Sequence, residues 1–291
     1  MISLSPVNTK FEKNFVKETV FSWRDMHRAE VVQKLTKVVL LMEYNGSGYY
    51  GFQLQSNLPT IQGEIEKALL KLTDKRIRVA AASRTDSGVH ALGQIVSFKT
   101  ESFLTPETFV SGLNHYLPKD IVVKMAHRVS DSFNVRHCAF SREYNYYILN
   151  NPVRSPIRAG FCHLVTGKLD ILAMNRAAQA LVGEHDFASF ATGAGAKLEN
   201  TCRKVYKARV EKDRGLVVFN MVANSFLIHQ VRNTVGALIK VGLEKMTTRE
   251  FRSIIEAKRP ALAGATAPAC GLCLIKVNYT GHFQGSGNEN L

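Results

Sequence analysis

The sequence predicts an α+β protein. Along the 291 residues, short apolar runs typical of strands are mixed with longer segments whose apolar residues recur at helical spacing. Residues 204–211 alternate in character, which places Tyr206, Ala208 and Val210 on one predicted face. A turn at 213–215 then leads into a second apolar run, so we expect a β-hairpin. Mixed strands and helices with such a hairpin are typical of the α+β class.

The first half of the chain contains two predicted helices between predicted strands. Thr60 can cap a helix that runs to about residue 72, and Thr105 with Pro106 begins another that ends near residue 118. The glycine-rich stretch at 46–51 lacks the Gly-Lys-Ser/Thr ending of a phosphate-binding P-loop. The expected strands of this half are residues 37–44, 79–82 and 94–98.

In the second half we also recognise elements by their caps and their apolar periodicity. Residues 129–139 are expected to connect the two halves. The expected elements are a strand at 144–149, a loop at 150–160, a helix capped by Asp170 that reaches about residue 182, the hairpin, a long helix at 226–243, a helix that starts at the capping box of Thr247 and Glu250, and a strand at 274–277.

The composition favours a polyanionic partner. Lys and Arg number 38 against 24 Asp and Glu, which gives a formal net charge of +14. A positive surface attracts phosphate backbones, so we rank nucleic acid as the first candidate partner and an anionic membrane surface as the second. The alternative is that the charge only keeps the protein soluble. No apolar stretch approaches the ~20 residues of a membrane-spanning helix, and we expect no membrane partner.

The five cysteines are scattered and odd in number, which indicates reduced thiols in a cytoplasmic protein. Cys270 and Cys273 form a C-x-x-C pair, and this leaves a zinc or thiol-redox role open as an alternative. The pair lacks a second pair of ligands at metal spacing and continues into a strand-like run, so we expect no metal.

The segment Ser83–Ala91 places an acid between two apolar segments. Arg84 lies two residues before Asp86, and Gly88 lies two residues after it. If the chain is extended at Arg84, the alternation of side chains along a strand puts Arg84 and Asp86 on the same side. A carboxylate on a turn between rigid strands is a sensible place for chemistry. By spacing alone, however, a turn aspartate that bonds to nearby backbone is favoured.

Several segments resemble the motifs of the tRNA pseudouridine synthase A (TruA) family, and they follow one another along the chain in the order that the family has. Residues 84–91 closely resemble the Arg-Thr-Asp-x-Gly-Val-His-Ala signature that surrounds the family's catalytic aspartate. The match extends from about residue 37 to 279, and a set of ordered motifs is far more specific than one. The other matching segments are 44–55 (YNGSGYYGFQLQ), 142–146 (REYNY), 183–190 (GEHDFASF), 224–233 (NSFLIHQVRN) and the pairs Ala267-Pro268 and Gly271-Leu272.

The resemblance implies two related α/β domains of the ferredoxin/RRM-like kind, which share one continuous, mostly antiparallel sheet with a central cleft. It also implies a homodimer that binds tRNA. Residues 1–36 precede the matched part of the chain and contain acids as well as bases. Transit peptides are poor in acids, so we expect no targeting role for this N-terminal extension. The expected divisions are an N-terminal extension at 1–36, a domain with the catalytic loop at 37–135, a second domain at 136–280 and a flexible tail at 281–291.

The reaction that the resemblance implies is the isomerisation of uridine to pseudouridine. The bond from uracil N1 to the ribose breaks, and the base rejoins the ribose through C5. Because the reaction involves no redox change, we expect no cofactor. Asp86 matches the catalytic carboxylate, and Arg232 matches the cation that pairs with it and favours its ionised form. The alternative for Arg232 is a surface arginine that lies along an apolar helix.

Two more site residues follow from the resemblance. Arg84 matches the residue that displaces or replaces the flipped base and contacts phosphate, and Tyr144 matches the tyrosine that stacks on the target base. Without the resemblance, Tyr144 would be interpreted as a core tyrosine of a strand. We interpret His90 and His185 as loop or packing histidines, and Asp186 as a turn acid.

We therefore expect a cytoplasmic isomerase that converts uridines of the tRNA anticodon arm, at positions of about 38–40. The alternatives are a synthase of the same family that acts on another RNA position, a non-catalytic tRNA-binding protein on the same fold, and a metal or thiol-redox protein built on Cys270 and Cys273. The intact set of Arg84, Asp86, Tyr144 and Arg232 argues against the non-catalytic protein.

Overall fold

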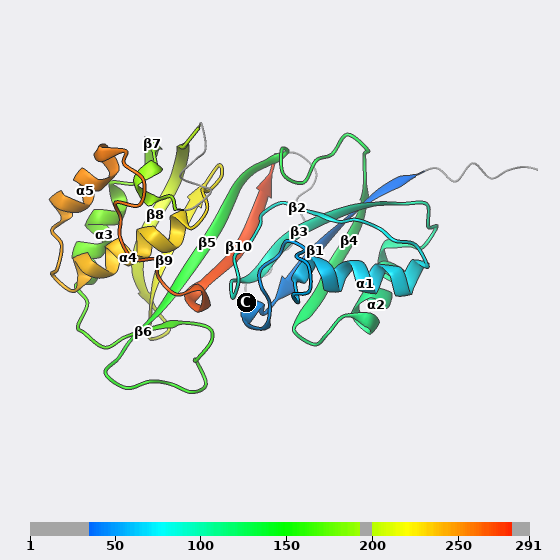
Figure 1. Cartoon of the computed structure of the whole chain (residues 1–291), viewed down its shortest axis with the longest axis horizontal. Helices are drawn as coiled ribbons and strands as arrows, with labels where there is room; N and C mark the ends of the chain where they lie inside the picture. Colours follow the sequence, from blue (N-terminus) through cyan, green and yellow to red (C-terminus); the bar gives the residue numbers. More distant parts are fainter. Residues whose placement is uncertain (1–34, 193–199, 281–291) are drawn as a thin grey trace, which may run out of the picture. The chain divides into compact units, whose positions relative to one another are not determined.

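One ten-stranded sheet runs through the residues that the computed structural model describes, 35–192 and 200–280 (Figure 1). Eight strands lie in the order β4-β1-β3-β10-β5-β9-β8-β7, while β2 pairs with β3 and β6 pairs with β5. The strands are β1 (Thr36–Tyr44), β2 (Ala80–Ala81), β3 (His90–Thr100), β4 (Ile121–Val129), β5 (Ala139–Asn150), β6 (His163–Val165), β7 (Gly183–Asp186), β8 (Cys202–Asp213), β9 (Leu216–Ala223) and β10 (Leu272–Tyr279).

Most neighbouring strands in this sheet are antiparallel. The parallel pairs are β10 with β3 and β5 with β6. The α+β class and the continuous, mostly antiparallel sheet are confirmed. The α-helices are α1 (Ile61–Thr73), α2 (Pro106–Tyr116), α3 (Ile171–Gln179), α4 (Gln230–Gly242) and α5 (Thr248–Ala257), and three short 3₁₀ turns are η2 (Gly46–Gly48), η3 (Ala188–Phe190) and η5 (Ala269–Gly271).

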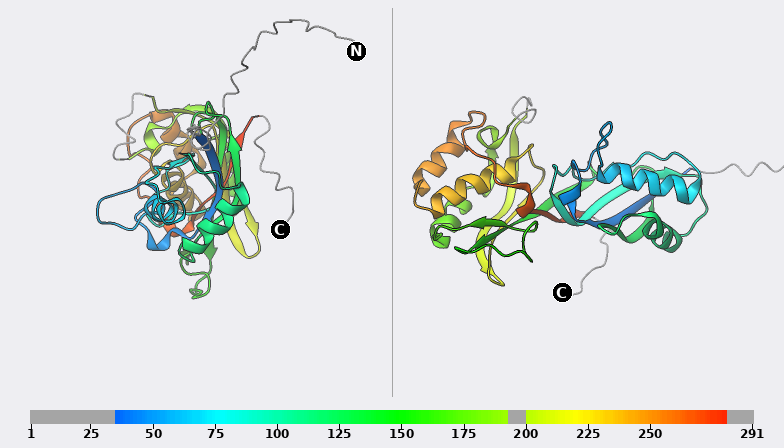
Figure 2. Two further views of the ribbon diagram at one scale, coloured as in Figure 1. Left: turned by 90° about the vertical axis from the view of Figure 1, so that its right-hand side faces the viewer. Right: turned by 60° about the horizontal axis from the view of Figure 1, so that its bottom comes forward.

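Helices α1, α2, α3 and α5 begin where the sequence predicts. Thr60, Thr105, Asp170 and Thr247 each accept a hydrogen bond from the backbone N–H three residues further on, which satisfies a donor that the first helical turn leaves unpaired. Helices α1 and α2 lie beside the β4-β1-β3 end of the sheet, and α3, α4 and α5 lie beside the β9-β8-β7 end (Figures 1 and 2). Each end of the sheet therefore has its own helical cover.

β10 joins the two ends of the sheet. This strand comes from the end of the described chain, yet it lies between β3 of the first half and β5 of the second. The division predicted between residues 135 and 136 falls in the connection from β4 to β5. It stays a prediction. Of the predicted extension and tail, residues 1–34 and 281–291 lie outside the described residues, and Thr36 already belongs to β1.

The long helix predicted at 226–243 is wrong at its start. Helix α4 begins at Gln230, because His229 adopts a left-handed conformation with φ 62° that a continuous helix excludes. The backbone N–H of Leu227 donates to the side chain of Gln230, so the preceding loop is closed against the first helical turn. Helix α3 also ends earlier than predicted, at Gln179, and Gly183 with φ 116° begins β7.

The predicted face of the hairpin strand is wrong for Tyr206. In β8, Ala208 and Val210 are buried, but Tyr206 is exposed and stacks on Phe140, with ring centroids 5.1 Å apart. The pairing of β8 with β9 shifts register between Val205 and Lys207. Such a bulge turns the following side chains to the opposite face, and alternation alone does not reveal it.

Strand β4 was not predicted, although its residues carry a usable pattern. Buried Ile121 and Val123 alternate with exposed Val122 and Lys124 before the pattern shifts. Strands β6 and β7 are three and four residues long, too short to show a period.

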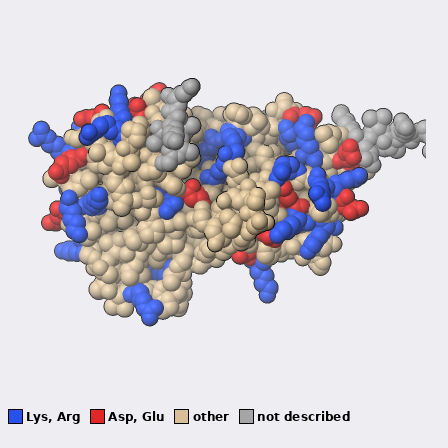
Figure 3. Space-filling view, in the orientation of Figure 1, with Lys and Arg blue, Asp and Glu red and all other residues tan. Residues whose placement is uncertain are grey.

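None of the helices in the described part of the chain is both long and apolar enough to span a membrane. Lys and Arg side chains lie at both ends of the face in Figure 3, with acidic side chains among them.

His90 is a packing histidine, as predicted, and it connects the start of β3 to two loops. Its Nδ1 accepts from the Gly46 N–H at 3.2 Å, and its Nε2 lies 2.9 Å from the Gly160 carbonyl oxygen, to which it must donate. Its ring stacks on Phe161. Burial lowers the pKa of His90, which favours this neutral form.

Because the pKa of His90 is lower in the folded than in the unfolded chain, its contribution to stability is complete above the unfolded value of about 6.5. That contribution is lost as the pH falls through the folded value. We expect His90→Gln to unfold more easily at pH 8 but to lose less stability between pH 7 and pH 5 than the parent chain. Urea unfolding at each pH measures this, with exposed His137→Gln as the control. Equal pH slopes for the parent and His90→Gln would contradict the assignment.

Candidate active site

A cleft of about 480 Å³ opens where loops from both halves of the sheet meet. Its walls come from the loop after β1, the segment 82–89 between β2 and β3, strand β5 and the loop that leads into α4. The predicted central cleft is therefore present. Its apolar lining includes Phe52, Val89, Leu227, Ile228 and Leu272.

The loop that carries Asp86 is held by the backbone of the loop after β1. The N–H of Phe52 donates to the carbonyl of Thr85 at 3.0 Å, and the N–H of Gly88 donates to the carbonyl of Tyr49 at 3.2 Å. At Gly51, whose φ is +91°, a Cβ atom would lie 2.9 Å from the Thr85 carbonyl oxygen. Only glycine fits this approach without displacing the loop.

The fully buried side chain of Gln94 supports the same loop from β3. Its amide donates to the Ser83 carbonyl at 2.8 Å, and its oxygen accepts from the Ser83 N–H at 3.3 Å. The amide also donates to the Tyr44 hydroxyl, which lies 2.8 Å from the hydroxyl of Thr85. Residues on both sides of Arg84 are thus fixed by one buried polar network. Sequence analysis did not identify Gln94, because a glutamine in a strand has no distinctive pattern.

We expect Gln94→Met to destabilise the protein by about 1–3 kcal/mol, since it leaves two part-buried backbone groups of Ser83 without these partners. The volume of the side chain is nearly conserved, so packing contributes little. Denaturant unfolding measures the loss, with exposed Gln53→Met as a matched control. A Gln94→Met variant as stable as the control would show that the network is dispensable.

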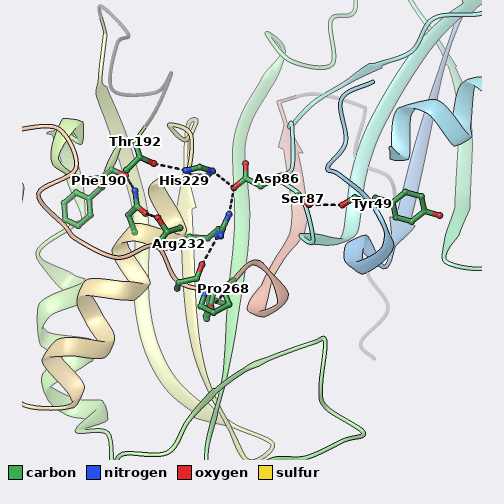
Figure 4. Close-up of polar contacts among 12 residues, drawn as sticks. Tyr49, Asp86, Ser87, Phe190, Thr192, His229, Arg232 and Pro268 are labelled. Atoms are coloured by element: carbon green, nitrogen blue, oxygen red, sulfur yellow. Dashed lines mark hydrogen bonds and ion pairs between the residues drawn. The ribbon is translucent and has the colours of Figure 1, made fainter. Parts of the chain in front are cut away.

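The structure pairs Asp86 with Arg232. Arg232 Nη1 lies 3.1 Å from Asp86 Oδ2, and Arg232 Nε donates to the carbonyl of Ala267 at 2.8 Å (Figure 4). The side chains are 28% exposed for Asp86 and 16% for Arg232. Arg232 belongs to α4 of the second half and Asp86 to the first, so the ion pair crosses the cleft. Sequence distance hides this contact, which spans 146 residues.

A second side chain approaches the same carboxylate oxygen. His229 Nε2 lies 3.6 Å from Asp86 Oδ2, and His229 Nδ1 lies 2.7 Å from the hydroxyl of Thr192. Within residues 35–192 and 200–280, no side chain or backbone group donates a hydrogen bond to Asp86 Oδ1. Sequence analysis gave His229 no role. Its position three residues before Arg232 was the available clue, because residues three apart at a helix start lie on one side.

Tyr144 stands in β5 and lines the cleft, but its side chain is largely buried. Its hydroxyl lies 2.7 Å from the hydroxyl of Ser83, and its ring meets Phe226 edge-on with centroids 5.2 Å apart. Burial, and more weakly the charge of Asp86, raises the pKa of Tyr144 to about 12. The phenol therefore stays protonated at neutral pH.

Besides Arg232, three arginines line the cleft near the Asp86 loop. Arg84 is exposed. Partial burial, and second the charge of Arg84, lowers the pKa of Arg136. Buried Arg142 donates only to backbone carbonyls, those of Ala82, Arg136, Ala139 and Asn224. Because no carboxylate of the described residues pairs with these three cations, this wall of the cleft is positive.

The similarity of the chain to known proteins covers nearly all of this architecture. A family model described as tRNA pseudouridine synthase matches residues 40–137 and 177–280. The chain belongs to the tRNA pseudouridine synthase family. The members of this family are isomerases. Asp86 and Arg84 lie in the first matched stretch and Arg232 in the second, whereas Tyr144 lies between the two.

Relatives within this pseudouridine synthase family align over most of their length. The chain is 41% identical over 254 residues to tRNA pseudouridine synthase A of Buchnera aphidicola subsp. Acyrthosiphon pisum (strain APS), covering 87% of this chain and 95% of that protein. It is 42% identical over 250 residues to the protein of the same name from Blochmanniella pennsylvanica (strain BPEN), covering 86% and 95%. With the protein of that name from Thermoanaerobacter sp. (strain X514), identity is 40% over 245 residues, covering 84% and 100%.

Other candidates for chemistry lie outside the cleft of this pseudouridine synthase fold. Cys270 and Cys273 are free thiols; Cys270 lies in η5, and Cys273 is buried in β10. Asp186 accepts from the Ala188 N–H and the Thr201 hydroxyl, so it is the turn acid that we predicted. His185 contacts the Val182 carbonyl. In the described ranges, no group of three or more His, Cys, Asp or Glu side chains is placed to hold a metal ion.

Proposed function

We propose that this chain is a tRNA pseudouridine synthase in which Asp86 is the catalytic carboxylate. The main support is the geometry of Asp86 in a member of this family. Its Oδ2 is paired with Arg232, while its Oδ1 receives no hydrogen bond from the described residues of the protein. An anchored carboxylate with one unengaged oxygen can act as a nucleophile or a base at a bound nucleoside.

The cleft suits a uridine that has left its stack. Enzymes that act on a base extrude the nucleotide into a pocket, where apolar side chains hold the base. In the reaction the N1–C1′ bond breaks, a C5–C1′ bond forms, the proton on C5 is lost and N1 gains a proton. The apolar wall and the ring of Tyr144 would hold the detached uracil away from water while it turns. Arg232 would hold Oδ2 of Asp86 in place while Oδ1 faces the nucleoside.

The positive wall would bind the RNA backbone on either side of the extruded nucleotide. Arg84 and Arg136 line the cleft as neighbouring cations, and planar guanidinium groups suit phosphate oxygens. The net charge of +14 would attract the rest of the tRNA. In our proposal Arg84 also occupies the space that the flipped base leaves, because it is exposed at the cleft beside Asp86.

We extend the proposal to the substrate and the assembly. The relatives bear the name tRNA pseudouridine synthase A, which supports tRNA as the substrate. By resemblance, we propose the anticodon arm, at positions of about 38–40, as the target, a homodimer as the active assembly, and the cytoplasm as the compartment. The division into domains at 37–135 and 136–280 is part of the same proposal.

The test is release of tritium from uridine C5. Unmodified tRNA transcripts carry tritium at C5, and the label reaches water only when C5 loses its proton. We expect release that disappears when the uridines at positions 38, 39 and 40 are all replaced by cytidine. Release that persists would indicate a synthase that acts on another position. Tight tRNA binding without release would indicate a non-catalytic binding protein.

A further inference from the structure

We propose that His229 is a positioning residue for Asp86, and that Thr192 orients its imidazole ring. This inference rests on the proposed function, in which Asp86 carries the chemistry. Thr192, His229, Asp86 and Arg232 form one chain of polar contacts (Figure 4). The chain links the segment after η3 to the Asp86 loop, so residues of the second half fix the position of a carboxylate that belongs to the first half.

His229 and Arg232 approach one oxygen of Asp86 from the second half. Their distances to Oδ2 are 3.6 Å from His229 Nε2 and 3.1 Å from Arg232 Nη1. A carboxylate turns easily about its Cβ–Cγ bond, so one contact on Oδ2 leaves the plane of the group poorly defined. A second contact to the same oxygen restricts that plane and leaves Oδ1 to face the substrate. The longer contact is of the kind that shortens when the substrate fills the site.

The two neighbours of His229 bear on which of its ring nitrogens carries the proton. A neutral imidazole has one donor and one acceptor nitrogen, and a hydroxyl can serve either. When the Thr192 hydroxyl donates to Nδ1 at 2.7 Å, the ring proton resides on Nε2 and points at Asp86. The carboxylate favours the same arrangement, since it can only accept. Asp86 thus selects the tautomer, and the Thr192 hydroxyl donates to the nitrogen that remains the acceptor.

The backbone at His229 is shaped for this task. His229 has φ 62° and ψ 2°, a left-handed conformation that is uncommon for residues other than glycine, although asparagine, aspartate and histidine adopt it more often than most. As the residue that caps α4, it has no side-chain capping bond to the helix. The ring instead lies between Thr192 and Asp86. An unusual backbone conformation at a cleft is a common mark of a functional position.

Two amide variants separate a positioning role from a backbone role. The Nε2 of glutamine can reach about where the Nε2 of histidine lies, whereas the shorter asparagine amide reaches only the Nδ1 position. Asparagine, however, tolerates the left-handed backbone better than glutamine does. We expect His229→Asn to lower kcat about tenfold with KM for tRNA within about twofold, and His229→Gln to keep kcat within about threefold. A backbone role predicts the opposite order.

Thr192→Val tests the second link. We expect it to lower kcat by about threefold in the parent chain and to have no further effect in His229→Asn, because the two residues act through one contact. His185→Asn, the same change at a histidine outside the cleft, is the control. A His229→Asn variant with normal kcat, a loss in KM alone, or an undiminished effect of Thr192→Val in the double variant would each overturn the proposal.

A readout without turnover separates this proposal from the proposed function. Nitrogen NMR of the ¹⁵N-labelled imidazole at pH 8.5 shows which ring nitrogen of His229 carries a proton. We expect a protonated Nε2 whose resonance moves in Asp86→Asn. An Nε2 without a proton overturns the positioning role even if tRNA is isomerised. If wild-type protein releases no tritium, the proposed function fails, and the ring proton still decides whether His229 faces Asp86 as a donor.

Discussion

Replacing Asp86 by asparagine is expected to abolish uridine isomerisation while tRNA binding persists. Asparagine has nearly the same size and can still accept from Arg232, but its amide is neither a nucleophile nor a base at neutral pH. Removing a group that forms or breaks bonds costs the most among catalytic substitutions, so we expect turnover to fall at least about 10⁴-fold. Single-turnover tritium release with saturating enzyme measures the chemical step directly.

Binding should change little in Asp86→Asn, or strengthen, because the variant removes a negative charge from a cleft that faces a polyanion. Filter binding of tRNA at fixed salt measures this. Asp131→Asn applies the same chemical change to a carboxylate that is 60% exposed, paired with Lys99 and distant from the cleft lining. The assignment would fail if Asp86→Asn kept more than a small fraction of wild-type turnover, or if Asp131→Asn lost as much.

Replacing Arg232 by methionine is expected to have the second largest effect. The variant keeps an apolar chain of similar length but removes the bonds to Asp86 and to the Ala267 carbonyl. A hydrogen bond to a charged group contributes about 1.5–3 kcal/mol, and 1.4 kcal/mol corresponds to about tenfold in rate. We therefore expect a loss of turnover of roughly 10–100-fold, with tRNA affinity within about threefold of wild type. Arg232→Lys should fall in between, because one ammonium cannot reproduce the planar fork.

The comparison of rate with affinity decides the role of Arg232. Arg252→Met removes an exposed arginine from α5 and serves as the control for lost charge. A large loss of tRNA affinity at normal turnover would show that Arg232 binds phosphate instead of serving Asp86. Since Arg232 is only 16% exposed, the unfolding free energy of each variant is measured alongside.

Much of the fold could be predicted from local patterns. Thr60, Thr105, Asp170 and Thr247 mark helix starts because a side-chain oxygen near an unpaired N–H is a local effect. The errors have non-local causes. The start of α4 depends on the left-handed residue His229, and the exposed side of Tyr206 depends on how β8 pairs with β9. Sheet register is set by the partner strand, which local spacing does not contain.

The sequence by itself determined the family motifs, the basic charge, most elements and the choice of Asp86, Arg84, Tyr144 and Arg232, since these depend on residue type and order. Only the tertiary structure decided which atoms meet. It placed β10 between the halves, brought Arg232 to Oδ2 across 146 residues, put Gln94 under the loop and set His229 between Thr192 and Asp86. The physical reason is distance: hydrogen bonds and ion pairs act over a few ångströms, and only folding brings residues that are far apart in sequence within that range.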